Sequence, residues 1–131
     1  GGDATLDSYV AHGRDPMDPG HLAWLERLPL IHTAADISTV FVHAGVSAAH
    51  YPRETAETYL WTRAATFFDP DRWVSPALRD MTVVHGHTVS LGGPDIAGGG
   101  RRINVDTGAV FGGALTAAIL VPGEAARFLS V

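Results

Sequence analysis

The sequence predicts an α+β fold with mixed sheets. Runs typical of strands outnumber runs typical of helices, and the last three strand-like runs are joined by short connections, which favours mixed or antiparallel pairing at the C-terminal end. Apolar residues make up 46% of the 131 residues, enough to bury a core. The length and the lack of an internal repeat predict a single domain over residues 1–131.

The first part of the chain is expected to hold a connector, a helix and two strands. Three leucines spaced three residues apart predict a short helix over residues 21–28, after a turn-rich connector at residues 13–20. Pro29 ends that helix. The β-branched run "STVFVH" predicts a strand over residues 38–43, and a shorter run predicts one over residues 30–33.

A longer helix over about residues 54–66 follows from an apolar face at helical spacing. Residues 76–80 are expected to form a helical turn, and the glycine-rich residues 92–100 a loop without regular structure. The members of the helical face are Ala56, Leu60, Arg63 and Phe67. The remaining strands are expected at residues 81–85, 102–106, 112–121 and 126–131.

The composition restricts the classes of function. The net charge is -5, which disfavours binding to a nucleic-acid scaffold. Because there is no cysteine, disulfides and thiolate metal sites are excluded, and any metal must be held by His, Asp, Glu or Asn. No apolar run is long enough to span a membrane and the first ten residues lack a signal sequence, so we expect a cytoplasmic protein. The opening Gly-Gly, without Met, suggests a piece of a longer chain.

Histidines stand at the ends of two predicted strands. His43 is followed by Ala-Gly, and His85 is followed by Gly86 and His87. Ligands bind outside the carboxyl ends of strands in open sheets, and neutral imidazole is a common ligand of divalent metals. Gly86 would let the chain bend so that the imidazole of His87 turns toward an ion. The alternative is that these are hydrogen-bonded core or turn residues.

Two further residues have more than one interpretation. Arg63 either clamps phosphate oxygens, or it forms an ion pair with Glu57, Asp69 or Asp71 or packs its stem while its head reaches water. The residues alone slightly favour the second interpretation, in either of its two forms. Asp106, in "VDTGA", either belongs to an Asp-Thr-Gly aspartic protease or caps a turn between two strands, and the turn is favoured.

Four motifs in order resemble a known enzyme family. They are "FVHAGV", "LWTR", "VVHGHT" and "RINVDTGAVFGGALTAAIL". Together they resemble the second half of the calcineurin-like metallophosphoesterases, in the branch of bacterial Ser/Thr protein phosphatases and symmetrical diadenosine tetraphosphatases. The resemblance covers nearly the whole chain. It implies a four-layer α/β/β/α sandwich with two divalent ions at the carboxyl ends of strands, whose N-terminal half is absent here.

The resemblance also implies roles for individual residues. His43 and His87 would ligate the second metal, and Arg63 would grip the substrate phosphate, which replaces the ion-pair interpretation. His85 would stand behind the ligands or face the substrate. The family's Asp-x-His, Gly-Asp-x-x-Asp-Arg-Gly and Gly-Asn-His motifs are not found. No catalytic residue is therefore expected in this chain, because the general-acid histidine would lie upstream.

The expected function is metal-dependent hydrolysis of phosphate esters, similar to a Ser/Thr phosphoprotein phosphatase. The complete protein would hold two ions of Mn, Fe, Zn or Mg, and this chain at most one partial site, so the isolated chain is expected to be inactive. The substrate would be a phosphoprotein, a dinucleoside polyphosphate or a small phosphate ester, with no membrane partner. The alternatives are a non-catalytic metal-binding remnant, a module completed by a partner, and, with least support, the aspartic protease.

Overall fold

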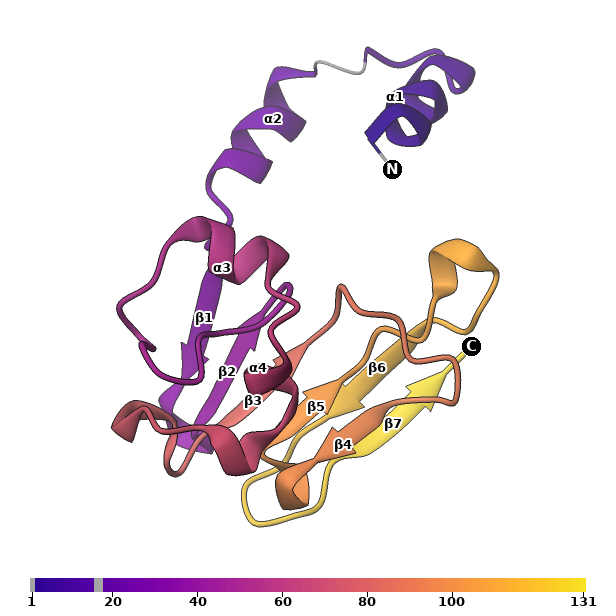
Figure 1. The fold of residues 1–131 in the computed structure, drawn as a ribbon. Helices are drawn as coiled ribbons and strands as arrows, with labels where there is room; N and C mark the ends of the chain where they lie inside the picture. Colours follow the sequence, from indigo (N-terminus) through magenta and orange to yellow (C-terminus); the bar gives the residue numbers. More distant parts are fainter. Residues whose placement is uncertain (1, 16–17) are drawn as a thin grey trace.

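The computed structural model describes residues 2–15 and 18–131, and its main feature is a mixed five-stranded sheet (Figure 1). The strand order is β1-β2-β3-β5-β4. The three central strands run parallel, and the two edge strands pair antiparallel to them. The strands are β1 (Ile31–Ala34), β2 (Thr39–Val42), β3 (Thr82–His85), β4 (Asp95–Ala97) and β5 (Arg102–Asn104).

A separate ribbon and four helices complete the fold. The ribbon pairs β6 (Thr116–Ile119) with β7 (Arg127–Ser130) in antiparallel orientation. Among the described residues, the longer helices precede the sheet, and two short ones follow β2 (Figure 1). The helices are α1 (Gly2–Ala11), α2 (Pro19–Glu26), α3 (Ala56–Trp61) and α4 (Ala65–Phe68). Short 3-10 turns lie at Ala35–Ile37, Pro70–Arg72, Pro76–Leu78, Gly98–Gly100 and Ala109–Phe111.

The largest cluster of buried apolar side chains is built around one face of the five-stranded sheet. Val40 and Val83 are register partners on neighbouring strands, so their side chains point to the same side, where both are fully buried. The segment after β2 covers them with Phe67 and Trp73, whose rings stack with centroids 5.9 Å apart. The indole Nε1 of Trp73 donates to the carbonyl oxygen of Phe67 at 2.9 Å, which satisfies the one polar atom of that buried ring.

The α+β class with mixed sheets and most of the expected strands are confirmed. Each of the six predicted strands overlaps an observed one, and the helix expected at residues 21–28 is α2. The structure adds two elements that were not expected, α1 and β4, the second of which lies in the glycine-rich stretch. Part of the expected connector at residues 13–20, residues 16–17, lies outside the described residues, and α2 already begins at Pro19.

The long helix expected over residues 54–66 is wrong. The chain forms α3, leaves the helical conformation at Thr62, which has ψ 136°, and re-enters it in α4. The hydroxyl of Thr62 accepts a hydrogen bond from the backbone N–H of Ala64, a local bond that competes with the helical pattern. Arg63 lies in this break and is exposed, so the inward orientation expected from helical spacing is also wrong.

Large apolar side chains remain exposed on several elements. A groove of about 450 Å³ lies between the first two strands on one side and, on the other, the end of α2 and the segment that follows it. Leu25, Leu28 and Leu30 form part of one wall, and Phe41 and His43 form part of the other.

No helix in the described parts of the chain, residues 2–15 and 18–131, has the length and apolar character needed to cross a membrane.

Candidate metal and phosphate site

The candidate site forms where two neighbouring parallel strands leave the sheet. β2 pairs with β3 in parallel, so the carboxyl ends of both strands lie at the same edge. His43 directly follows β2, and His87 lies two residues after β3. The backbone N–H of Gly86 donates to the carbonyl oxygen of His43 at 2.9 Å, which continues the pairing past the last residues of the two strands. Residues 44 positions apart in the sequence therefore meet at this edge.

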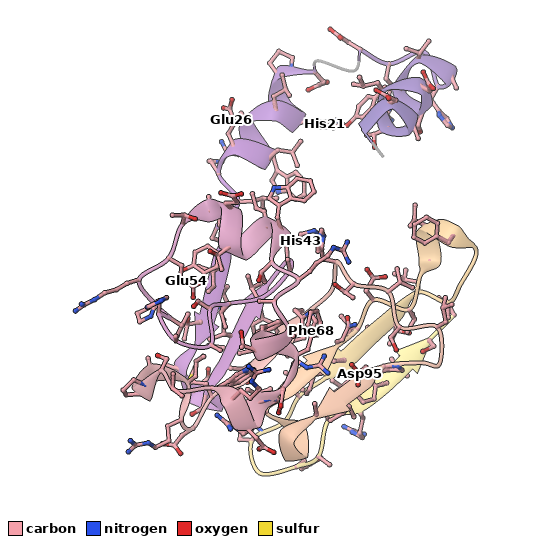
Figure 2. All side chains as sticks on the ribbon, in the orientation of Figure 1. His21, Glu26, His43, Glu54, Phe68 and Asp95 are labelled. Carbon is pink, nitrogen blue, oxygen red and sulfur yellow. The ribbon has the colours of Figure 1, made fainter. Side chains whose placement is uncertain are left out.

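The two imidazoles converge nitrogen to nitrogen. Nε2 of His43 lies 3.1 Å from Nδ1 of His87, and the ring centroids are 4.9 Å apart at an angle of 66°. In Figure 2, His43 lies toward the end of the sheet nearest α2, well away from Phe68 and Asp95. The third strand end at this edge belongs to β5, which pairs in parallel with β3 on its other side.

The bend that aims His87 is made by His87 itself. Its φ is 66°, in the left-handed region that non-glycine residues rarely adopt, whereas Gly86 has no positive φ. A Cβ added to Gly86 would meet the side chain of Asp106 at 3.5 Å and the carbonyl oxygen of His43 at 3.9 Å, both ordinary contact distances. The expected bend at Gly86 is therefore wrong. Strained conformations of this kind cost on the order of 1–3 kcal/mol and cluster at functional sites.

The loop that carries His87 is bonded to the end of β5 and the residues that follow it. Nδ2 of Asn104, at the end of β5, donates to the carbonyl oxygen of Thr88 at 2.6 Å, and the Asn104 side chain is buried. The N–H of Ser90 donates to the carbonyl oxygen of Asp106 at 2.8 Å. These bonds hold His87 in place despite its backbone strain. Sequence reasoning missed Asn104, because the strand predicted over residues 102–106 placed it inside the strand, whereas β5 ends at this residue.

Arg63 contacts the same loop from the break between α3 and α4. Its guanidinium donates to the hydroxyl of Thr88 at 3.1 Å and to the carbonyl oxygen of His87 at 3.2 Å. Arg63 forms no salt bridge with Glu57, Asp69 or Asp71, all of which the structure describes, so the ion pair expected for Arg63 is wrong. An arginine has five N–H donors, and these contacts leave some of them available on an exposed side chain.

The electrostatics of His87 favour the neutral imidazole. Burial lowers its pKa, and the nearby Arg63 and His43 lower that pKa further, while Asp106 opposes the change. The Nε2 atom of His87 is buried and has no hydrogen-bond partner, whereas Nδ1 faces His43. Neutral imidazole is the form that binds metal ions.

The pair fits two positions of a divalent metal site. Metal–nitrogen bonds of about 2.0–2.1 Å can meet on one ion only if the nitrogens are less than about 4.2 Å apart, a condition that this pair meets. Within the described parts of the chain, no three His, Cys, Asp or Glu side chains gather in a way that could hold a metal. His43 and His87 therefore offer two donors, and a closed site would need others.

His85, the last residue of β3, is buried in the fold. Its side chain is 2% exposed, and its ring packs edge-to-face on Phe67 with centroids 4.9 Å apart. Nη1 of Arg102 donates to Nε2 of His85 at 3.2 Å, and Nη2 of the same arginine pairs with Asp95 at 2.6 Å. His85 thus contacts residues inside the fold, and the two roles expected for it stay predictions.

Asp106 caps a turn, as the favoured interpretation predicted. Its Oδ1 accepts a hydrogen bond from the N–H of Gly108 at 3.0 Å, which closes an Asx turn after β5. Gly108 has a φ of 79°, so the turn uses its glycine in the left-handed region.

Comparison with known proteins finds a distant relative. Over 101 residues the chain is 33% identical to a bis(5'-nucleosyl)-tetraphosphatase, PrpE [asymmetrical], of Halalkalibacterium halodurans. The matched segment covers 70% of this chain but 40% of the relative, so the chain spans less than half of that protein's length. No protein-family model matches the chain, and no solved structure matches it.

The relative agrees with the expected reaction class at a coarse level. By its name it is a phosphatase that acts on bis(5'-nucleosyl) tetraphosphates, so the chain is similar to a hydrolase of phosphate compounds. The similarity does not support the finer assignment to the Ser/Thr protein phosphatase and symmetrical tetraphosphatase branch, which stays a prediction.

The burial of His85 predicts a loss of stability in mild acid. Desolvation lowers the pKa of His85 from 6.5 to about 4, with a smaller contribution from the charge of Arg102, against an opposing hydrogen bond to Gly86. Between pH 6.5 and about pH 4, the imidazole of His85 is therefore protonated in the unfolded chain but stays neutral in the folded chain. The free energy of unfolding should fall by about 2 kcal/mol between pH 7 and pH 5 from this residue alone.

Denaturant unfolding with a chelator present measures this effect. His85→Gln keeps an acceptor for Arg102 but cannot titrate, so the parent should lose about 2 kcal/mol more than the variant between the two pH values. Equal losses in both proteins would show that His85 does not resist protonation.

Proposed function

We propose that this chain is part of a metal-dependent phosphoester hydrolase, to which it contributes two ligands of one metal ion and an arginine that binds the phosphate. The observation that carries the proposal is the 3.1 Å approach of His43 Nε2 to His87 Nδ1, beside the guanidinium of Arg63. The similarity to a named tetraphosphatase supports the same reaction class independently.

The residues of this chain would hold and orient the reactants. His43 and His87 present nitrogen donors at one edge of the sheet, and a divalent ion bound there would polarise a phosphoryl group. Arg63 donates N–H groups toward the phosphoryl oxygens and counters their negative charge, while the loop of His87 and Thr88 fixes its guanidinium. No group of this chain is assigned as the general acid.

The remaining ligands and the N-terminal half of the four-layer sandwich are proposed to come from residues outside this chain. Two observations support this. The described residues supply fewer than three converging ligands, and the chain spans 40% of its named relative. The exposed apolar groove beside His43 offers a surface that further polypeptide could cover.

Among the substrates considered, the relative favours a dinucleoside polyphosphate over a phosphoprotein. The limit of two donors favours one alternative function, a non-catalytic module that binds an ion weakly. The aspartic protease has no such support, because Asp106 is engaged in capping a turn.

Removing either imidazole should weaken metal binding. The variants His43→Ala and His87→Ala are each expected to bind Zn²⁺ more than about tenfold more weakly than the parent chain. Removing a residue that only orients a metal ligand already lowers affinity by about tenfold or more, and losing the ligand itself should lower it further. Competition with a chromophoric chelator measures the affinity. His50→Ala removes an exposed histidine elsewhere and should change nothing. Equal affinities in all four proteins would contradict the site.

Arg63 should determine the affinity for phosphate. Hydrogen bonds to charged groups contribute about 1.5–3 kcal/mol, so Arg63→Ala should weaken binding of inorganic phosphate by about 10- to 100-fold in the presence of Mg²⁺. Arg63→Lys keeps the positive charge but loses the planar guanidinium, so its affinity for phosphate should lie between that of the parent and that of Arg63→Ala. Binding is measured by NMR titration with Arg53→Ala, another exposed arginine, as the matched control. If Arg53→Ala weakened binding as much, a diffuse charge effect would replace the proposed clamp.

The chain by itself should not turn over a phosphate ester. With Mn²⁺ added, hydrolysis of p-nitrophenyl phosphate is expected to remain at the rate of the buffer, because two imidazoles leave the ion without the further ligands of a catalytic centre. The parent chain is compared with the His87→Ala variant. Turnover by the parent that the variant lacks would show that the chain is sufficient for catalysis.

A further inference from the structure

The candidate site has an aromatic neighbour that neither the ligands nor the phosphate clamp require. Trp61 is the last residue of α3, and the centroid of its ring lies 5.7 Å from that of His87 with the planes nearly perpendicular, at 87°. Its side chain is 68% exposed. Two residues later the chain reaches Arg63, whose guanidinium bonds to the loop of His87. Trp61 therefore extends the site outward from the point where a phosphate would bind.

Packing does not explain a tryptophan at this position. Trp61 is absent from the buried core, and its one ring contact among the described residues is with His87. Most of the large indole surface thus faces water, and the ring that it contacts belongs to the loop to which Arg63 donates its hydrogen bonds. An exposed indole presents a flat surface for stacking, and aromatic bases stack on such surfaces whatever their sequence.

We propose that Trp61 is the residue on which the base of a 5'-nucleotide substrate stacks while its phosphate lies at Arg63. This rests on the proposed function, because it needs the phosphate site. A ligand that occupies both positions carries a planar π system joined to a phosphate by a short linker, and a nucleoside phosphate has that architecture. A phosphoserine residue lacks an aromatic face of its own. Trp61 would therefore select nucleotides over phosphoproteins.

The other two tryptophans provide internal controls. Trp73 is 8% exposed, and its Nε1 is bonded to the carbonyl oxygen of Phe67, so a ligand cannot stack on it. Trp24, on α2, is 56% exposed but has no place in the proposed site. Non-specific stacking of a base on any open indole would reach Trp24 as well as Trp61.

The experiment is an NMR titration of the chain, with Mg²⁺ present, against three phosphates: adenosine 5'-monophosphate, ribose 5-phosphate and O-phosphoserine. Each indole N–H gives its own cross-peak, and that of Trp61 is assigned by its loss in Trp61→Phe. The nucleotide should bind about tenfold tighter than the other two, the gain typical of one stacked base. It should shift the Trp61 cross-peak and leave that of Trp24 in place.

Variants then separate stacking from general packing. Trp61→Leu should bring the affinities for the nucleotide and ribose 5-phosphate to the same value, whereas Trp61→Phe, which keeps an aromatic face, should retain most of the difference. Trp24→Leu should keep the full difference. Because each result is a ratio of two affinities in one protein, a general change in the phosphate site cancels.

The outcomes also separate this inference from the function on which it rests. If ribose 5-phosphate and O-phosphoserine bind as tightly as the nucleotide, or if the preference survives in Trp61→Leu, stacking on Trp61 is overturned while the phosphate site stands. Equal shifts at Trp24 and Trp61 also overturn it. If none of the three phosphates binds, the phosphate site itself is overturned and the stacking role falls with it.

Discussion

The parallel pairing of β2 with β3 is the constraint on which the candidate site depends. Parallel neighbours leave the sheet at the same edge, so the residues that follow them are neighbours whatever their distance in sequence. His43 and His87 meet for this reason, and Asn104 joins them because β5 is also parallel to β3. Antiparallel pairing of the same two strands would have placed the two imidazoles at opposite ends of the sheet.

The strands were predictable because their signals are local. Short β-branched runs bounded by small residues predicted β2 and β3 within one or two residues of their bounds. The prediction of one helix over residues 54–66 was wrong because the spacing of apolar residues does not reveal where tertiary contacts make a chain bend. Here the N–H of Ala44 bonds to the carbonyl oxygen of Tyr59, and the chain turns away soon afterwards. β4 was missed because an edge strand of three residues among glycines owes its conformation to pairing with β5.

The site was predictable in part. Two strand ends with the same pattern drew attention to His43 and to the segment of His87, and the resemblance chose between His85 and His87. The structure then distinguishes the two histidines, which the residue type alone could not do, because the ring of His85 is buried against Phe67 and Arg102 inside the fold. Trp61 and Asn104 gave no sequence signal strong enough to select them, because their importance lies in contacts with a loop more than ten residues away.

The positive φ of His87 lowers the stability of the folded chain, while the same residue supplies one of the two imidazoles of the proposed site. At this position glycine would relieve the backbone, and asparagine would tolerate it better than most residues do, yet neither supplies an imidazole. A redesign that ranks substitutions by folding free energy alone would be drawn to replace this histidine first. Thermostability gained there would come at the expense of the donor that faces His43, so position 87 should be held fixed in any attempt to engineer a more robust form of the protein.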